Sequence, residues 1–154
     1  MKGFMKIRTL VVMLFLLLGT VPVSAVERPF ALRGTGVATL ITDESGHLVG
    51  AIPTGSGTAT HLGQWTVTGN VKYTPVDGVL KSSGEATITA SDGDKLQIVI
   101  DGILDPVAAM DQGVFHIVGG TGRFEGATGD ANFVVSINPL TGGFELTLVG
   151  KINY

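Results

Sequence analysis

Apolar and polar residues alternate with a period of two through most of the chain beyond residue 30. Between Phe30 and Ile41 the even positions are apolar or glycine, whereas the odd positions include Arg33 and Thr35. Successive side chains of a β-strand point to opposite faces, so this alternation predicts a strand with one buried face. Similar stretches, separated by Gly, Asp, Asn and Pro, recur near 47–53, 57–61, 63–72, 83–90, 94–103, 112–119, 131–137 and 143–152. The pattern predicts an all-β chain with eight or nine strands.

One segment departs from this alternation. In the run 105–110, Asp105 can accept hydrogen bonds from the free amides at the start of a helix, and Pro106 suits the first turn. We therefore expect a helix of one or two turns between two of the strands.

The parity of the apolar positions predicts how two hairpins pair, because a one-residue slip would turn every apolar side chain to the solvent. A three-residue loop over 91–93 sets Ile88 opposite Leu96, whereas a two-residue turn would set it opposite a polar residue. Val67 of the preceding strand can then pair with Ile88, and Gly93 takes a left-handed conformation in a bulge. In the last hairpin, across the loop 138–142, one apolar face meets another: Ala131, Phe133, Val135 and Ile137 face Phe144, Leu146 and Leu148.

Consecutive antiparallel strands with one apolar face each can bury those faces by closing into a barrel or by stacking two sheets. We predict a single antiparallel eight-stranded β-barrel, with a two-sheet β-sandwich as the alternative. Glycines within the strands, such as Gly34, Gly36 and Gly102, allow the sharp coiling that a small barrel requires.

The first 25 residues have the three parts of a secretory signal peptide. Three basic residues precede the apolar run 10–18, and Val23 and Ala25 have the small-x-small spacing of a cleavage site. A membrane-spanning helix would need about 20 apolar residues, so this run is too short for an anchor. We expect cleavage near Ala25, a single mature domain over 26–154, and a secreted or periplasmic product that is not attached to a membrane.

Composition narrows the partners and the chemistry. The chain has 10 Lys plus Arg and 13 Asp plus Glu; without the three basic residues of the signal, 7 remain against 13, a net charge of −6. An acidic chain with no basic run lacks a surface for phosphate backbones, so no nucleic-acid partner is expected. The sequence has no cysteine and only three histidines, which show no ligand spacing, so we expect no disulfide and no metal site.

The stretch 117–129 combines dense glycine with one aromatic residue, Phe124. Glycine permits positive φ angles, so the pattern predicts a tight corner, with Phe124 as the anchor that plugs one end of the barrel. A phosphate-binding loop is excluded, because neither the G-x-G-x-x-G spacing nor a following Lys-Ser or Lys-Thr is present.

Within this stretch, the sequence GGTGRFEGATG resembles the Gly-Gly-Ser/Thr-Gly-x-Phe motif of the allene oxide cyclase and dirigent barrel superfamily, and the export signal suits a bacterial secreted member. The resemblance implies an eight-stranded antiparallel barrel. It also implies a cofactor-free apolar cavity, in which members of the superfamily cyclise a fatty-acid epoxide or steer the coupling of phenols. It implies no catalytic residue in this chain, because the matched segment lies at the corner and the cysteine associated with the cyclases is absent.

We therefore expect a cofactor-free barrel that binds a small apolar molecule in its interior. Six inward positions are the predicted lining: Trp65, Val67, Ile88, Leu96, Phe133 and Leu146. His116 is the candidate polar contact; its imidazole either enters the cavity or lies at the barrel mouth or on the outside.

Two other functions use the same fold: a cyclase-like, isomerase-like or coupling-directing enzyme acting in the cavity, and a structural or protein-binding barrel. A hollow interior with an inward acid or base favours the enzyme, a hollow apolar interior the binder, and a solid one the scaffold. Catalytic residues and the oligomeric state stay open.

Three polar groupings have a functional and an ordinary interpretation. Glu85 and Asp101 could form an acid/base pair, but their polar neighbours favour solvent exposure. Arg123 with Glu125 could clamp a carboxylate ligand or simply lie on the exposed side of a turn. Facing threonines could bind a regular surface, although threonine is also common on the solvent face of strands; the predicted pairs are Thr66 with Thr89 and Thr68 with Thr87.

Overall fold

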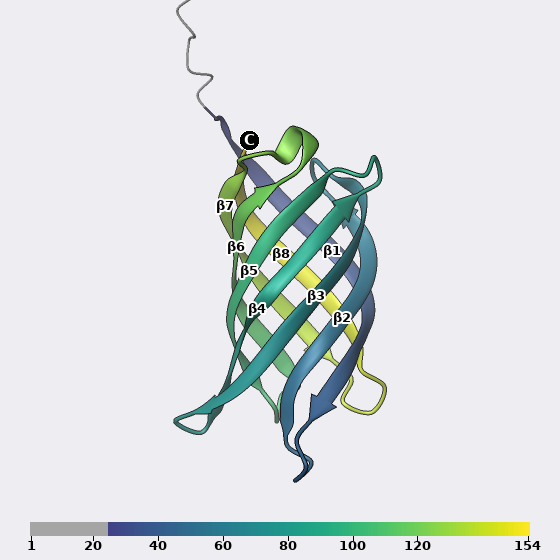
Figure 1. The fold of residues 1–154 in the computed structure, drawn as a ribbon, viewed down its shortest axis with the longest axis vertical. Helices are drawn as coiled ribbons and strands as arrows, with labels where there is room; N and C mark the ends of the chain where they lie inside the picture. Colours follow the sequence, from purple (N-terminus) through teal and green to yellow (C-terminus); the bar gives the residue numbers. More distant parts are fainter. Residues whose placement is uncertain (1–24) are drawn as a thin grey trace, which may run out of the picture.

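The computed structural model describes residues 25–154, so the predicted signal peptide up to residue 24 lies outside the described part. Its strands are β1 (Glu27–Thr42), β2 (Leu48–Ala59), β3 (Gly63–Val76), β4 (Val79–Ala90), β5 (Lys95–Asp105), β6 (Met110–Gly120), β7 (Thr128–Ile137) and β8 (Gly143–Asn153), and the short 3-10 helix η1 (Gly122–Phe124) precedes β7. Each strand pairs antiparallel with the next, and β8 pairs with β1, which closes the barrel (Figure 1). The predicted antiparallel eight-stranded barrel is confirmed over the sandwich alternative. Within residues 25–154, no helix has the length and apolar character needed to cross a bilayer.

The predicted helix over 105–110 is wrong. Residues 106–109 form a turn between β5 and β6, and the Asp105 carboxylate accepts hydrogen bonds from the amides of Val107 at 2.8 Å and Ala108 at 3.0 Å. Ala109 has a φ of 51°, which ends any helical path. The capping chemistry was thus recognised correctly, but it closes a turn.

The predicted hairpin registers are confirmed. Val67 pairs with Ile88, and Ile88 pairs with Leu96. The loop between β4 and β5 is closed by a 2.8 Å hydrogen bond from the Ala90 amide to the Asp94 carbonyl, and Gly93 has a φ of 93°. The last hairpin and the outward threonines pair as expected: Phe133 with Leu148, Val135 with Leu146, Ile137 with Phe144, Thr66 with Thr89, and Thr68 with Thr87.

The two ends of the barrel differ in packing. We call the end that carries η1 and the C-terminus the closed end, and the opposite end, with the β1–β2, β3–β4, β5–β6 and β7–β8 connections, the mouth (Figure 1). At the closed end Phe124 is 0% exposed, and its ring meets the edge of Tyr154 at a centroid distance of 5.0 Å. Trp65, Leu96 and Ile152 are also fully buried. The predicted role of Phe124 as a buried anchor at the barrel end is confirmed.

Arg123 ties the connections of the closed end together. Its guanidinium pairs with Asp92, lies 3.3 Å from the Asp94 carboxylate and donates to the carbonyl of His61 at 2.9 Å. These groups come from the β4–β5 and β2–β3 connections. Arg123 is therefore engaged within the chain rather than joined with Glu125 in a clamp for a ligand.

Inward glycines make room for large rings. A Cβ atom at Gly34 would lie 2.4 Å from the Trp65 ring, and one at Gly102 would lie 2.7 Å from the Phe133 ring. Both distances are shorter than a van der Waals contact. These glycines therefore serve side-chain packing as well as the predicted strand coiling.

Candidate functional site

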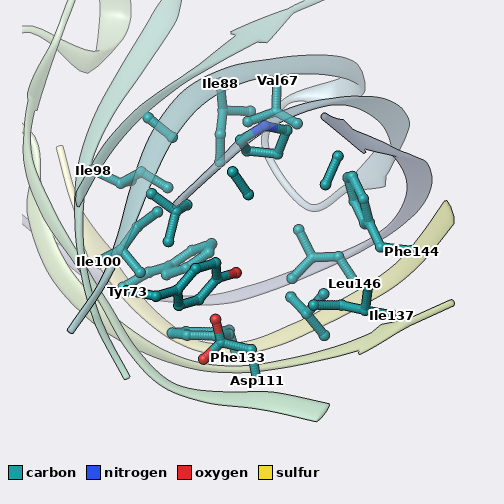
Figure 2. Close-up of a pocket in the computed structure, with 17 residues that line it drawn as sticks. Val67, Tyr73, Ile88, Ile98, Ile100, Asp111, Phe133, Ile137, Phe144 and Leu146 are labelled. Atoms are coloured by element: carbon teal, nitrogen blue, oxygen red, sulfur yellow. The ribbon is translucent and has the colours of Figure 1, made fainter. Parts of the chain in front are cut away.

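The part of the barrel between the closed-end plug and the mouth, which we call the mouth half, encloses a cavity of about 70 Å³ (Figure 2). Every strand contributes to its wall, which is apolar except for Tyr73 and Asp111; the other lining residues are Ala38, Ala51, Pro53, Val67, Val71, Ala86, Ile88, Ile98, Ile100, Phe115, Phe133, Val135, Ile137, Phe144 and Leu146.

The cavity communicates with solvent through the mouth. The side chains that plug the closed end are fully buried, whereas Val135 and Ile137 of the cavity wall, in the part of β7 that ends at the mouth, are only half-buried. A molecule entering the barrel would therefore come through the mouth and meet an apolar wall.

Three side chains form a polar cluster in this apolar surrounding: Tyr73 from β3, Ser82 from β4 and Asp111 from β6. Ser82 is 0% and Asp111 5% exposed, and the Ser82 hydroxyl donates a 2.7 Å hydrogen bond to Oδ1 of Asp111. Tyr73 pairs with Ser82 in the β-ladder. Figure 2 shows the Tyr73 hydroxyl and the Asp111 carboxyl turned toward the same part of the cavity.

Burial sets the electrostatics of this cluster. It raises the pKa of Asp111, because loss of water disfavours the charged form, and the hydrogen bonds from Ser82 and from the Gln112 amide offset this only in part. Burial, followed by the nearby Asp111 carboxyl, also raises the pKa of Tyr73. Of the ion pairs within residues 25–154, none includes Asp111. The cluster thus presents a carboxyl group that can donate a proton or accept a hydrogen bond inside an apolar cavity.

Sequence reasoning missed this polar cluster, although the alternation contained the signal. Asp111 occupies the same side of β6 as the buried Phe115, and Tyr73 the same side of β3 as the buried Val71. Tyr73 lies just beyond the predicted strand 63–72, and Asp111 lies between the predicted helix 105–110 and the predicted strand 112–119, so neither position was given a strand face. The strands in fact continue through both residues.

The structure divides the predicted site residues into three groups. Four of them line the cavity: Val67, Ile88, Phe133 and Leu146. Trp65 and Leu96 are buried but do not line it. His116 lies on the outer face, where its side chain is 45% exposed and its Nδ1 lies 2.5 Å from an Asp130 carboxylate oxygen. His116 therefore does not enter the cavity; of its predicted locations, the outside of the barrel is the one observed.

The other candidate acids also face solvent. Glu85 and Asp101 are exposed, and Asp101 lies 3.5 Å from the Lys81 ammonium. Among the described residues, no group of three or more His, Asp or Glu side chains is placed to hold a metal ion. The titratable side chains that line the cavity are therefore Tyr73 and Asp111, both in the polar cluster.

Comparison with known proteins bears on the fold. No family model and no curated protein matches the sequence. Among solved structures, the barrel is similar to two pterocarpan synthase dirigent proteins. PsPTS1 gives a TM-score of 0.58 at 13% identity, over 85% of this chain and 96% of that one. GePTS1 gives 0.57 at 15% identity, over 85% and 89%.

At this level of identity the likeness concerns the fold alone. The chain has a dirigent-like barrel, as the glycine motif predicted. The likeness to allene oxide cyclases and the bacterial origin remain predictions.

Proposed function

We propose that this chain is an exported barrel that binds one small, largely apolar molecule in the cavity of its mouth half. The observation that carries the proposal is an apolar cavity, closed at one end, with a single polar cluster in its wall. Small-molecule sites typically combine an apolar lining with a few placed polar groups that fix the ligand's orientation. A purely structural barrel would have a solid interior, whereas the mouth half contains a cavity.

The polar cluster gives the ligand a preferred direction. An apolar body would contact Val67, Ile88 and Phe133, while one polar group would meet Asp111. A molecule lacking that group would leave the buried carboxyl unsatisfied on its cavity side, at a cost of about 1–3 kcal/mol. The ligand is therefore apolar with one polar end.

A second candidate function is proton transfer to the bound molecule, in an isomerase-like, cyclase-like or coupling-directing reaction. Burial keeps Asp111 protonated to a higher pH than an exposed aspartate, so its carboxyl could act as a general acid. The pterocarpan synthase names of the two similar structures suggest the same class of role, though only by analogy of fold.

Native mass spectrometry of the protein purified from the organism that encodes it tests the binding proposal. A copurifying small molecule that is lost in Ala51→Leu supports it, because the larger side chain extends into the cavity from a wall position. The matched control is Ile52→Leu on the adjacent outward position, which is 44% exposed and should keep the ligand. A bare mass for the well-folded wild type, or equal retention in both variants, would argue against the proposal.

The enzymatic candidate has a separate test. A small-molecule extract of the same organism is incubated with the wild type or with Asp111→Asn, and the products are compared by untargeted mass spectrometry. A product that requires Asp111 supports proton transfer; a bound but unchanged compound leaves binding as the function.

A further inference from the structure

We propose that the ligand of this cavity is a small organic cation, a protonated amine with a compact apolar group, whose ammonium lies against Asp111. The inference deepens the proposed function and rests on it, because it names the chemical class of the molecule that the cavity binds.

The first argument is the missing counter-charge. Asp111 is 5% exposed, and none of the ion pairs formed within the described chain involves it. Its protein partners are the Ser82 hydroxyl and the Gln112 amide, both neutral, which occupy two of about four acceptor positions of a carboxylate. A buried carboxylate with no cation beside it takes up a proton more readily, which is the direction of the Asp111 pKa shift, and a cation placed beside it would favour the charged form. A ligand ammonium would supply the charge that the barrel itself does not provide.

The second argument is the aromatic surrounding. The rings of Phe115 and Phe133 pack with a centroid distance of 4.4 Å, and both line the cavity together with Tyr73. A Cβ atom at Gly102 would lie 2.7 Å from the tip of the Phe133 ring and 2.7 Å from the Ser82 hydroxyl. The Phe133 ring therefore lies beside the polar cluster (Figure 2). Aromatic faces attract ammonium groups, most strongly where water is excluded.

The third argument is the charge of the entrance. The connections at the mouth contain Asp43, Glu44 and Asp77, and Asp105 ends β5 at the same end. These connections contain no lysine or arginine, and their one histidine, His47, lies 3.3 Å from the Asp43 carboxylate. An acidic rim raises the local concentration of cations and repels anions, so it favours the entry of an amine over that of a carboxylate.

The size of the cavity limits the apolar group. A cavity of about 150 Å³ can hold benzene, and the volume here is about 70 Å³. Scaled from benzene, the group inside the barrel has roughly three carbon atoms, with any larger part extending into the mouth.

The test uses three probes of one shape and different charge: isobutylamine, isobutanol and isobutyrate. Each is titrated into the isotope-labelled mature protein, and the dissociation constant is taken from NMR shifts of the cavity methyl groups. We expect the amine to bind at least tenfold more tightly than the alcohol, and the alcohol more tightly than the carboxylate.

The variant Asp111→Asn should lose the preference for the amine while it keeps the binding of isobutanol. Asp101→Asn, which removes an exposed carboxylate on the neighbouring strand, is the matched control and should bind all three probes as the wild type does. If Asp111→Asn does not fold, the order of the three affinities in the wild type carries the test alone.

The outcomes separate the two proposals. Equal binding of amine and alcohol by the wild type, or an amine preference that persists in Asp111→Asn, overturns the cation inference and leaves ligand binding intact. Failure of every probe to shift the cavity methyl groups overturns both.

Discussion

Replacing Phe124 by alanine removes a fully buried ring from the closed end, where packing is complete. Truncation of a buried phenylalanine costs about 3–5 kcal/mol. Phe124 is 0% exposed, touches the Tyr154 ring, and lies under the Arg123 guanidinium at 4.6 Å, so we expect a loss of about 4 kcal/mol. The same truncation at Phe144 should cost about 2 kcal/mol, because this ring borders the cavity and has fewer packing partners to lose.

Urea unfolding followed by fluorescence measures both values, since the single tryptophan, Trp65, is buried in the native barrel. With a slope of about 2 kcal/mol per molar urea, Phe124→Ala should lower the midpoint by about 2 M and Phe144→Ala by about 1 M. Val149→Ala, at an outer position that is 60% exposed, should change the free energy of unfolding by less than about 0.5 kcal/mol. Equal losses for the two phenylalanines would refute the distinction between a packed end and a hollow end.

Three further predictions concern the interior and the outer face. Because the pKa of Asp111 is raised in the folded state, the folded protein holds its proton more tightly; stability should therefore fall as pH rises from about 4 through the folded pKa, and Asp111→Asn should reduce this fall in pH-dependent urea unfolding. Gly102→Ala should destabilise the barrel by about 1–3 kcal/mol in the same assay, since the new methyl group meets the Phe133 ring and the Ser82 hydroxyl; an unchanged midpoint would contradict the packing described here. His116→Ala should leave probe binding within twofold of wild type, and a lost NMR titration would place His116 in the site after all.

Much of the fold could be predicted, because a strand has only two faces, and the odd or even position of a residue along the strand determines which face its side chain occupies. Once Ile88 is assigned to the buried face, Val67 and Leu96 must lie opposite it on the neighbouring strands. This register also determines the length of the loop between β4 and β5. Phe124 was predictable as an anchor because it is the one aromatic residue in a glycine-rich corner. The turn after Asp105 was harder, because the same capping chemistry serves a helix start and a tight turn.

The site was predictable only in part, because the alternation shows which side chains point inward but not how far along the barrel axis each of them lies. Trp65 and Val67 share one face of β3, but only Val67 reaches the cavity, since depth depends on the stagger of all eight strands. His116 was ambiguous because its strand carries apolar residues on both faces, with Val118 exposed on the outside. Asp111 was missed because it fell between a predicted helix and a predicted strand, so its inward position on β6 was not recognised.

The central claim is that the mouth half of the barrel is hollow and receives a small apolar group. A crystal structure of the mature protein under xenon pressure tests it most directly, because xenon enters apolar cavities without needing a polar contact. The account predicts one xenon site between Val67, Ile88 and Phe133, and none in the closed half around Phe124. A barrel interior filled by its own side chains, with no xenon among those three residues, would contradict it.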